Sequence, residues 1–222
     1  TDDTIVNADI KTSAAIALSK LATDPSNASN LASGTVPTAR LGSGTASSTT
    51  ILYGDQTYKT EPAAGLTVVD QWRLSATFSG DANPVTSNWE RVDTAGQGTL
   101  GSAMTESSGV FTFPSTGIYL VTFVSGARAY SGNAEESYEI FITVTTDNST
   151  GPTWVDFAEC HQCASGTGSS DLNVVTQTTV DVTDVAEVKV RFGIDAYVSN
   201  TMTLASSTKN NCFMTFMRVG DT

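Results

Sequence analysis

Residues 111–123 read Phe111-Thr-Phe-Pro-Ser-Thr-Gly117-Ile-Tyr119-Leu-Val121-Thr-Phe123 and are the most informative part of the sequence. Side chains alternate between the two faces of a β-strand, so Phe111 and Phe113 share one face of a first strand. Pro114 and Gly117 are typical turn residues and separate this strand from a second one. The stretch therefore predicts two strands joined by a short turn.

The second of these strands is apolar on both faces. Tyr119, Val121 and Phe123 lie on one face, and Ile118 and Leu120 lie on the other. A strand with two apolar faces is normally covered on both. We therefore expect it in the middle of a sandwich, or between a sheet and a neighbouring subunit.

Further strands are expected on either side of this stretch, from residue 62 to the end of the chain. Alternating or β-rich segments occur at 72–78, 138–144, 154–157, 172–182, 188–194, 202–204 and 213–219. Eight or more strands separated by polar turns indicate an antiparallel sandwich, and this number suits a jelly roll. The predicted fold class is mainly β, with a jelly-roll head over residues 62–222.

Residues 1–61 have a different composition and predict a separate region. Thr12–Ala22 is the one convincing helix, which Thr12 or Ser13 can cap and Pro25 ends. Its apolar stripe has the spacing of a bundle seam and consists of Ile10, Ala14, Ala17 and Leu21. A helix of this length is marginal alone, so we expect the same helix of other copies to pack against it.

The rest of this region is poor in apolar residues. Leu31–Thr35 and Leu41–Thr45 repeat at a ten-residue spacing, and Ile51–Tyr58 follows. So few apolar side chains cannot fill a core from one chain. Two interpretations stay open: a disordered linker, or several copies that wind together into an extended stalk.

Composition limits the partners. The chain has 222 residues, with 11 Lys and Arg against 23 Asp and Glu, which gives a net charge of −12. Such a surface repels nucleic acid and anionic membranes, so we expect neither as a partner. Apolar runs stay well short of the roughly 20 residues of a membrane span, which predicts no membrane insertion.

The central stretch carries a resemblance to a known family. Phe111, Gly117, Tyr119, Val121 and Phe123 follow a spacing similar to the C1q/TNF-like jelly-roll signature, with Val121 in place of the usual Phe. Upstream, the residues Thr99 and Met104 depart from the signature, whereas 213–219 resembles the aromatic strand that closes such heads. The resemblance implies a compact, trimeric binding head.

A second resemblance concerns the N-terminal region. Ile5–Ile10, Ala15–Leu21, Asn30–Leu41 and Gly42–Ala46 look like repeat segments of tailed-bacteriophage tail fibres. Tyr53–Tyr58 is similar to a phrase that often closes such stalks. This resemblance implies a homotrimeric virion fibre, assembled in the host cytoplasm and contacting other virion proteins through its N-terminal side.

These resemblances give candidate site residues. Candidates for the threefold interface are Ile10, Ala17, Leu21, Tyr119, Phe123, Phe213 and Phe216. Candidates for contact with a host-surface glycan or protein are Tyr130, Asn133 and Glu135, and the loop at 166–170 is a further candidate. Three copies would then turn weak individual contacts into strong attachment.

One motif invites metal or redox chemistry. Cys160-His-Gln-Cys163 offers two thiols and an imidazole, and Cys212 is the remaining soft ligand. A redox role needs a thioredoxin-like βαβ unit, which the pattern lacks. We expect no metal or other cofactor, and instead either a local disulfide or free, partly buried thiols, with His161 in a turn or an interface.

Carboxylates are numerous, but their spacing singles out no catalytic pair. We therefore expect a structural protein without catalytic residues. Two rivals remain: a tailspike-type enzyme that degrades host polysaccharide, and a secreted C1q-like binding head. The absence of a collagen repeat and of a leader in this sequence argues against the second rival.

Overall fold

The structure is a computed structural model that describes residues 40–60, 65–132, 134–149 and 151–222. The chain divides into two units, Thr1–Pro62 and Ala63–Thr222. The helix predicted at 12–22, with Ile10, Ala17 and Leu21, lies outside the described residues. The first repeat of the predicted stalk lies outside them too.

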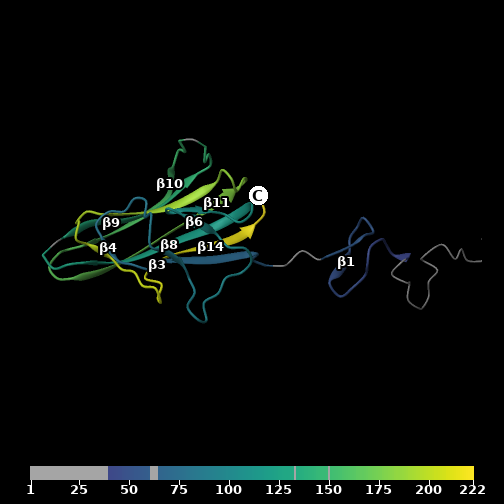
Figure 1. The fold of residues 1–222 in the computed structure, drawn as a ribbon, viewed down its shortest axis with the longest axis horizontal. Helices are drawn as coiled ribbons and strands as arrows, with labels where there is room; N and C mark the ends of the chain where they lie inside the picture. Colours follow the sequence, from purple (N-terminus) through teal and green to yellow (C-terminus); the bar gives the residue numbers. More distant parts are fainter. Residues whose placement is uncertain (1–39, 61–64, 133, 150) are drawn as a thin grey trace, which may run out of the picture. The chain divides into compact units, whose positions relative to one another are not determined.

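The second unit, called the head below, is an antiparallel β-sandwich (Figure 1). Its strands are β3 (Val68–Leu74), β4 (Phe78–Ser79), β5 (Trp89–Arg91), β6 (Thr105–Ser107), β7 (Val110–Thr112), β8 (Gly117–Ala129), β9 (Glu135–Thr145), β10 (Val155–Ala164), β11 (Ser170–Val182), β12 (Lys189–Ala196), β13 (Met202–Thr203) and β14 (Cys212–Gly220). The strands predicted at 138–144, 172–182, 188–194 and 213–219 are therefore confirmed.

Two sheets face each other in the head. The β8 sheet has the order β4-β13-β8-β14-β3-β5, and β11 pairs with the other edge of β8. The β9 sheet has the order β10-β9-β12-β7-β6. Sequence neighbours thus often lie in different sheets, which is why most contacts that hold the sandwich together are distant in the sequence.

The central stretch of the sequence crosses from one sheet to the other. Its first strand is β7, in the β9 sheet, and its second strand is β8, in the β8 sheet. Gly117 begins β8 with φ of 139°, and a Cβ there would lie 2.4 Å from Nε of Arg218. The glycine of the motif is thus required because Arg218 of the neighbouring strand packs directly against its backbone.

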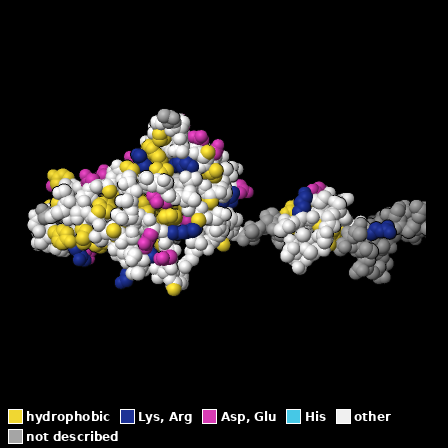
Figure 2. All heavy atoms as spheres, in the orientation of Figure 1, with side chains coloured by type: hydrophobic (Ala, Val, Ile, Leu, Met, Phe, Trp, Pro, Cys, Tyr) yellow, Lys and Arg dark blue, Asp and Glu magenta, His cyan; other side chains and the backbone are white. Residues whose placement is uncertain are grey.

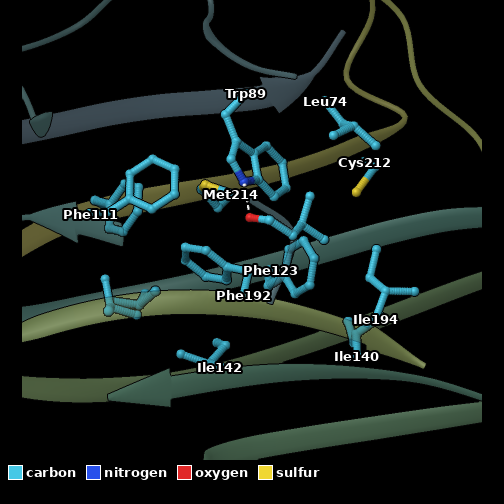
Figure 3. Packing of buried hydrophobic residues seen from close by; sticks show 14 of the residues in the cluster. Leu74, Trp89, Phe111, Phe123, Ile140, Ile142, Phe192, Ile194, Cys212 and Met214 are labelled. Carbon is cyan, nitrogen blue, oxygen red and sulfur yellow. Dashed lines mark hydrogen bonds between the residues drawn. The ribbon is translucent and has the colours of Figure 1, made fainter. Parts of the chain in front are cut away.

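The core between the sheets is built around aromatic rings. The ring of Phe192 lies 5.0 Å from that of Phe123, 5.5 Å from that of Phe111 and 6.3 Å from that of Trp89, measured between centroids. The indole of Trp89 donates a 3.0 Å hydrogen bond to the carbonyl of Val85 (Figure 3). Most of these pairs meet edge to face, an arrangement that adds to the stabilisation from apolar burial.

The chain enters and leaves the head at one end. The start of β3 pairs with the end of β14, through Val68 and Arg218, and the C-terminus lies there (Figure 1). Other connections lie at the opposite end, where Gly132 donates to Gly166 and Tyr197 donates to Ser137 through their backbones. We call this the loop end of the head; its described residues are 130–132, 134, 165–169 and 197–201.

The described part of the first unit is a small hairpin of β1 (Thr50–Leu52) and β2 (Tyr58–Thr60). Asp55 caps its turn by accepting from the backbone of Thr57, and it pairs with Lys59. These partners, Lys59 above all, lower the pKa of Asp55 to about 2. None of the described residues 40–60 is fully buried, so this hairpin has no core of its own.

Candidate functional site

The β8 sheet turns an apolar face away from the core. Its register places outward side chains of β3, β8 and β14 in three rows, most of them half-buried. One apolar row consists of Val69, Met217 and Leu120. A second row consists of Phe213 and Val124, extended on β11 by Val175, which is 54% exposed, and on β3 by Arg73, which is fully buried. Between them lies a polar row of Gln71, Thr215 and Thr122, extended by Gln177 on β11. We call this surface the outer face of the β8 sheet.

This face differs from the rest of the surface in its charge. On the central strands β3, β8 and β14, no outward position holds an aspartate or a glutamate; the outward carboxylates Asp171 and Asp181 of β11 and Glu90 of β5 lie toward the edges of the sheet. The outward side of β9 and β12, by contrast, carries Glu139 and Asp195. Hydrophobic side chains gather in patches on the visible side of the head, with charged ones scattered around them (Figure 2). The centre of the outer face therefore offers a second acidic copy a contact without opposing carboxylates.

The structure corrects three of the predicted interface residues. Tyr119, Phe123 and Phe216 are completely buried between the two sheets of one chain, so no second subunit can contact their side chains. Phe213 lies on the outer face, half-buried, and stays a candidate. Ile118 and Leu120, on the other side of β8 from Tyr119, occupy the surface that the sequence left open to a neighbouring subunit.

The two predicted contact loops lie together at the loop end. The backbone of Ser131 donates to the hydroxyl of Ser169, and that of Gly132 donates to Gly166. Tyr130 is 39% exposed, as a contact residue requires, and Asn133 lies outside the described residues. Alternation within single strands did not show that these two loops would meet.

The prediction that Glu135 contacts a receptor is wrong, because this side chain is fully buried. Its carboxylate accepts hydrogen bonds from the backbone of Val198 and the hydroxyl of Thr201, and thereby holds the 197–201 loop. Close by, the Tyr138 hydroxyl bonds to Ser125 and to Thr203. Burial raises the pKa of Tyr138.

An acidic hollow at the loop end was not foreseen from the sequence. It measures about 310 Å³ and is lined by Asp81, Ser137, Glu139, Asp195, Ala196 and Tyr197. Asp195 and Glu139 are directly opposite each other on β12 and β9. Burial raises the pKa of Asp195, and the nearby charges of Asp81, Glu139 and Asp156 raise it further.

Replacing Asp195 by Asn is expected to stabilise the head at pH 7. Because the pKa of Asp195 is raised in the folded protein, its protonated carboxyl contributes stability at low pH. This contribution is lost as the pH rises through the pKa that Asp195 has in the folded protein. Removing a like charge from a cross-strand pair is worth about 0.2–1 kcal/mol. Denaturant unfolding at pH 7 and at pH 4 measures this gain, which should shrink at the lower pH. Asp181→Asn on exposed β11 is the control, and an equal gain there would contradict the argument.

The cysteine-histidine motif lies in β10, not in a turn, so His161 is an exposed strand residue. Cys160 packs partly against the core, whereas Cys163 is exposed and donates to the carbonyl of Glu136. Cys212 is buried in β14, where burial raises its thiol pKa to about 12. All three thiols are free. Within the described ranges, no group of three such side chains is arranged to hold a metal ion.

Comparison with known proteins bears on the fold. No protein-family model matches the sequence, and no curated protein matches it. Among solved structures, Eiger TNF from S. frugiperda is similar at 13% identity, with a TM-score of 0.50, over 71% of this chain and 96% of that one. Murine APRIL at pH 5.0 is similar at 10% identity, with a TM-score of 0.48, over 68% and 98%.

The head has a TNF-like jelly-roll fold. The likeness to Eiger covers nearly the whole of that chain, and it confirms the predicted antiparallel sandwich. Identity this low shows the fold alone. The described part of the chain contains no helix long and apolar enough to cross a membrane.

Proposed function

We propose that this chain is a structural fibre protein of a tailed-bacteriophage virion, homotrimeric, with a TNF-like head that attaches the particle to the host surface. The observation that carries the proposal is the apolar outer face of the β8 sheet, whose central strands β3, β8 and β14 hold no outward carboxylate on a chain with a net charge of −12. A face of this kind favours association with further copies. The likeness of residues 5–58 to fibre segments gives the biological setting.

The shape of the head supports an adhesive role. Its chain ends lie at one end, and the loops that carry Tyr130 and Tyr197 lie at the other. Three loop ends on one trimer bind a repetitive surface jointly, so modest individual affinities suffice.

The hairpin of the first unit supports self-association as well. Leu41, Ile51 and Leu52 are each more than 40% exposed. A two-stranded hairpin is marginally stable alone. In a stalk, copies of this hairpin would cover one another's apolar side chains.

Leu120→Asp is expected to weaken association of the head about 100-fold. Within a trimer it would place an unpaired carboxylate in an apolar contact, whereas in a monomer the same side chain is half-exposed and tolerated. Sedimentation velocity over a concentration series measures the change. Thr105→Asp adds the same charge to the exposed strand β6 of the other sheet and should leave association unchanged. Equal sedimentation of the Leu120→Asp variant and the wild type would remove the outer face from the interface.

Attachment itself is tested with the labelled wild-type chain on bacterial cells. A trimer that saturates host cells and blocks adsorption of the phage, together with recovery of the chain from purified virions, supports the proposal. Absence of the chain from purified virions would contradict the proposal. Release of oligosaccharide from host polysaccharide, abolished by changing one carboxylate, would favour the tailspike-type enzyme instead.

A further inference from the structure

The outer face contains a row of hydrogen-bonding side chains within a surface that is otherwise suited to apolar association. Gln71, Thr215 and Thr122 are neighbours on three adjacent strands, and each is half-buried before any second copy arrives. The amide of Gln71 donates a 2.9 Å hydrogen bond to the hydroxyl of Thr215. Apolar side chains of β8 and β14 lie on both sides of this polar row. It is thus a polar stripe through the middle of the apolar surface.

Such a stripe constrains how a second copy can bind. Each hydroxyl and amide has hydrogen-bonding capacity beyond the one bond within the row. Contact with a second copy removes water from these groups. The second copy must therefore place its own donors and acceptors directly opposite the polar row. A slip by one row, which is two residues along a strand, would place Thr122 and Thr215 against leucine, valine or methionine.

We propose that the row of Gln71, Thr215 and Thr122 sets the register and the stoichiometry of self-association. This inference rests on the proposed homotrimer, and it identifies the polar row as the feature that selects the trimer over other stoichiometries. The apolar rows drive association without specifying its geometry, because apolar contact is non-directional. The polar row penalises every arrangement in which it meets an apolar surface. A single buried polar residue selects the oligomer state of coiled coils in the same way, at a cost in stability.

The double variant Thr122→Val/Thr215→Val tests the inference in the full-length chain. Valine keeps the shape of threonine, favours strands and has a methyl group in place of each hydroxyl. Native mass spectrometry of the wild type should show one stoichiometry. The variant should show at least two, with tighter association overall. Circular dichroism and a thermal melt establish that the variant is folded.

The matched control is Thr105→Val/Thr112→Val. These threonines form a cross-strand pair on β6 and β7, in the other sheet. The control should keep the single wild-type stoichiometry. A double variant at Thr122 and Thr215 that stays a homogeneous trimer would overturn the inference but leave the proposed fibre protein intact. A wild-type chain that is monomeric at all concentrations would overturn both.

Discussion

Phe192→Ala is expected to lower the free energy of unfolding of the head by about 3–5 kcal/mol, the range measured when a buried phenylalanine is truncated. Phe192 is fully buried on β12 and stands at the centre of the aromatic cluster. Its ring contacts rings from both sheets, including Phe123 of β8 and Phe216 of β14. The cavity cannot close easily, because its walls belong to strands that hydrogen bonds hold in place.

Urea unfolding at a fixed protein concentration measures this loss, since association would otherwise change the apparent stability. Tyr197→Ala is the control, because that ring is 66% exposed and its truncation should change stability by less than about 0.5 kcal/mol. Similar losses at both positions would mean that Phe192 is not the centre of the core.

The sequence predicted the strands of the head well, because alternation is a local property. On β12 the pattern of Val190, Phe192 and Ile194 against Arg191 needs no knowledge of other strands, and these three apolar side chains are all buried. On β8 the same reasoning identified two apolar faces. It did not tell which face points inward, so Tyr119 and Phe123 were expected at a subunit interface although they form the core of one chain.

Features formed by segments that lie far apart along the chain were not predicted from the sequence. The acidic hollow exists because the segment after β4 runs beside β12, where Asp81 accepts from the backbone of Ala196, 115 positions away. Glu135 looked like a loop residue, but the pairing of β9 with β10 is irregular between Gln162 and Ala164, and its side chain is buried. A β-bulge of this kind changes which side chains face inward, and no local pattern announces it.

Asp70→Ala is expected to destabilise the head by about 3–5 kcal/mol, the cost of removing one partner of a buried ion pair. Asp70 is fully buried on β3 and pairs with Arg91 of β5 at 2.9 Å. It also accepts from the indole of Trp72 and from the backbone of Met104, in the segment that leads into β6 of the opposite sheet. One carboxylate thus joins the two sheets at their edge, and alanine would leave these donors unsatisfied.

Asp221→Ala is the matched control, because Asp221 pairs with Arg218 but is 92% exposed. Exposed ion pairs contribute about 0–1 kcal/mol, so this variant should unfold at nearly the wild-type urea concentration. Hydrogen exchange adds a spatial readout for the Asp70 variant, since loss of the tie should deprotect the amides of β5 and β6 before those of β8. If the two aspartate variants unfolded at the same urea concentration, the bond network of Asp70 would not hold the edge of the sandwich closed.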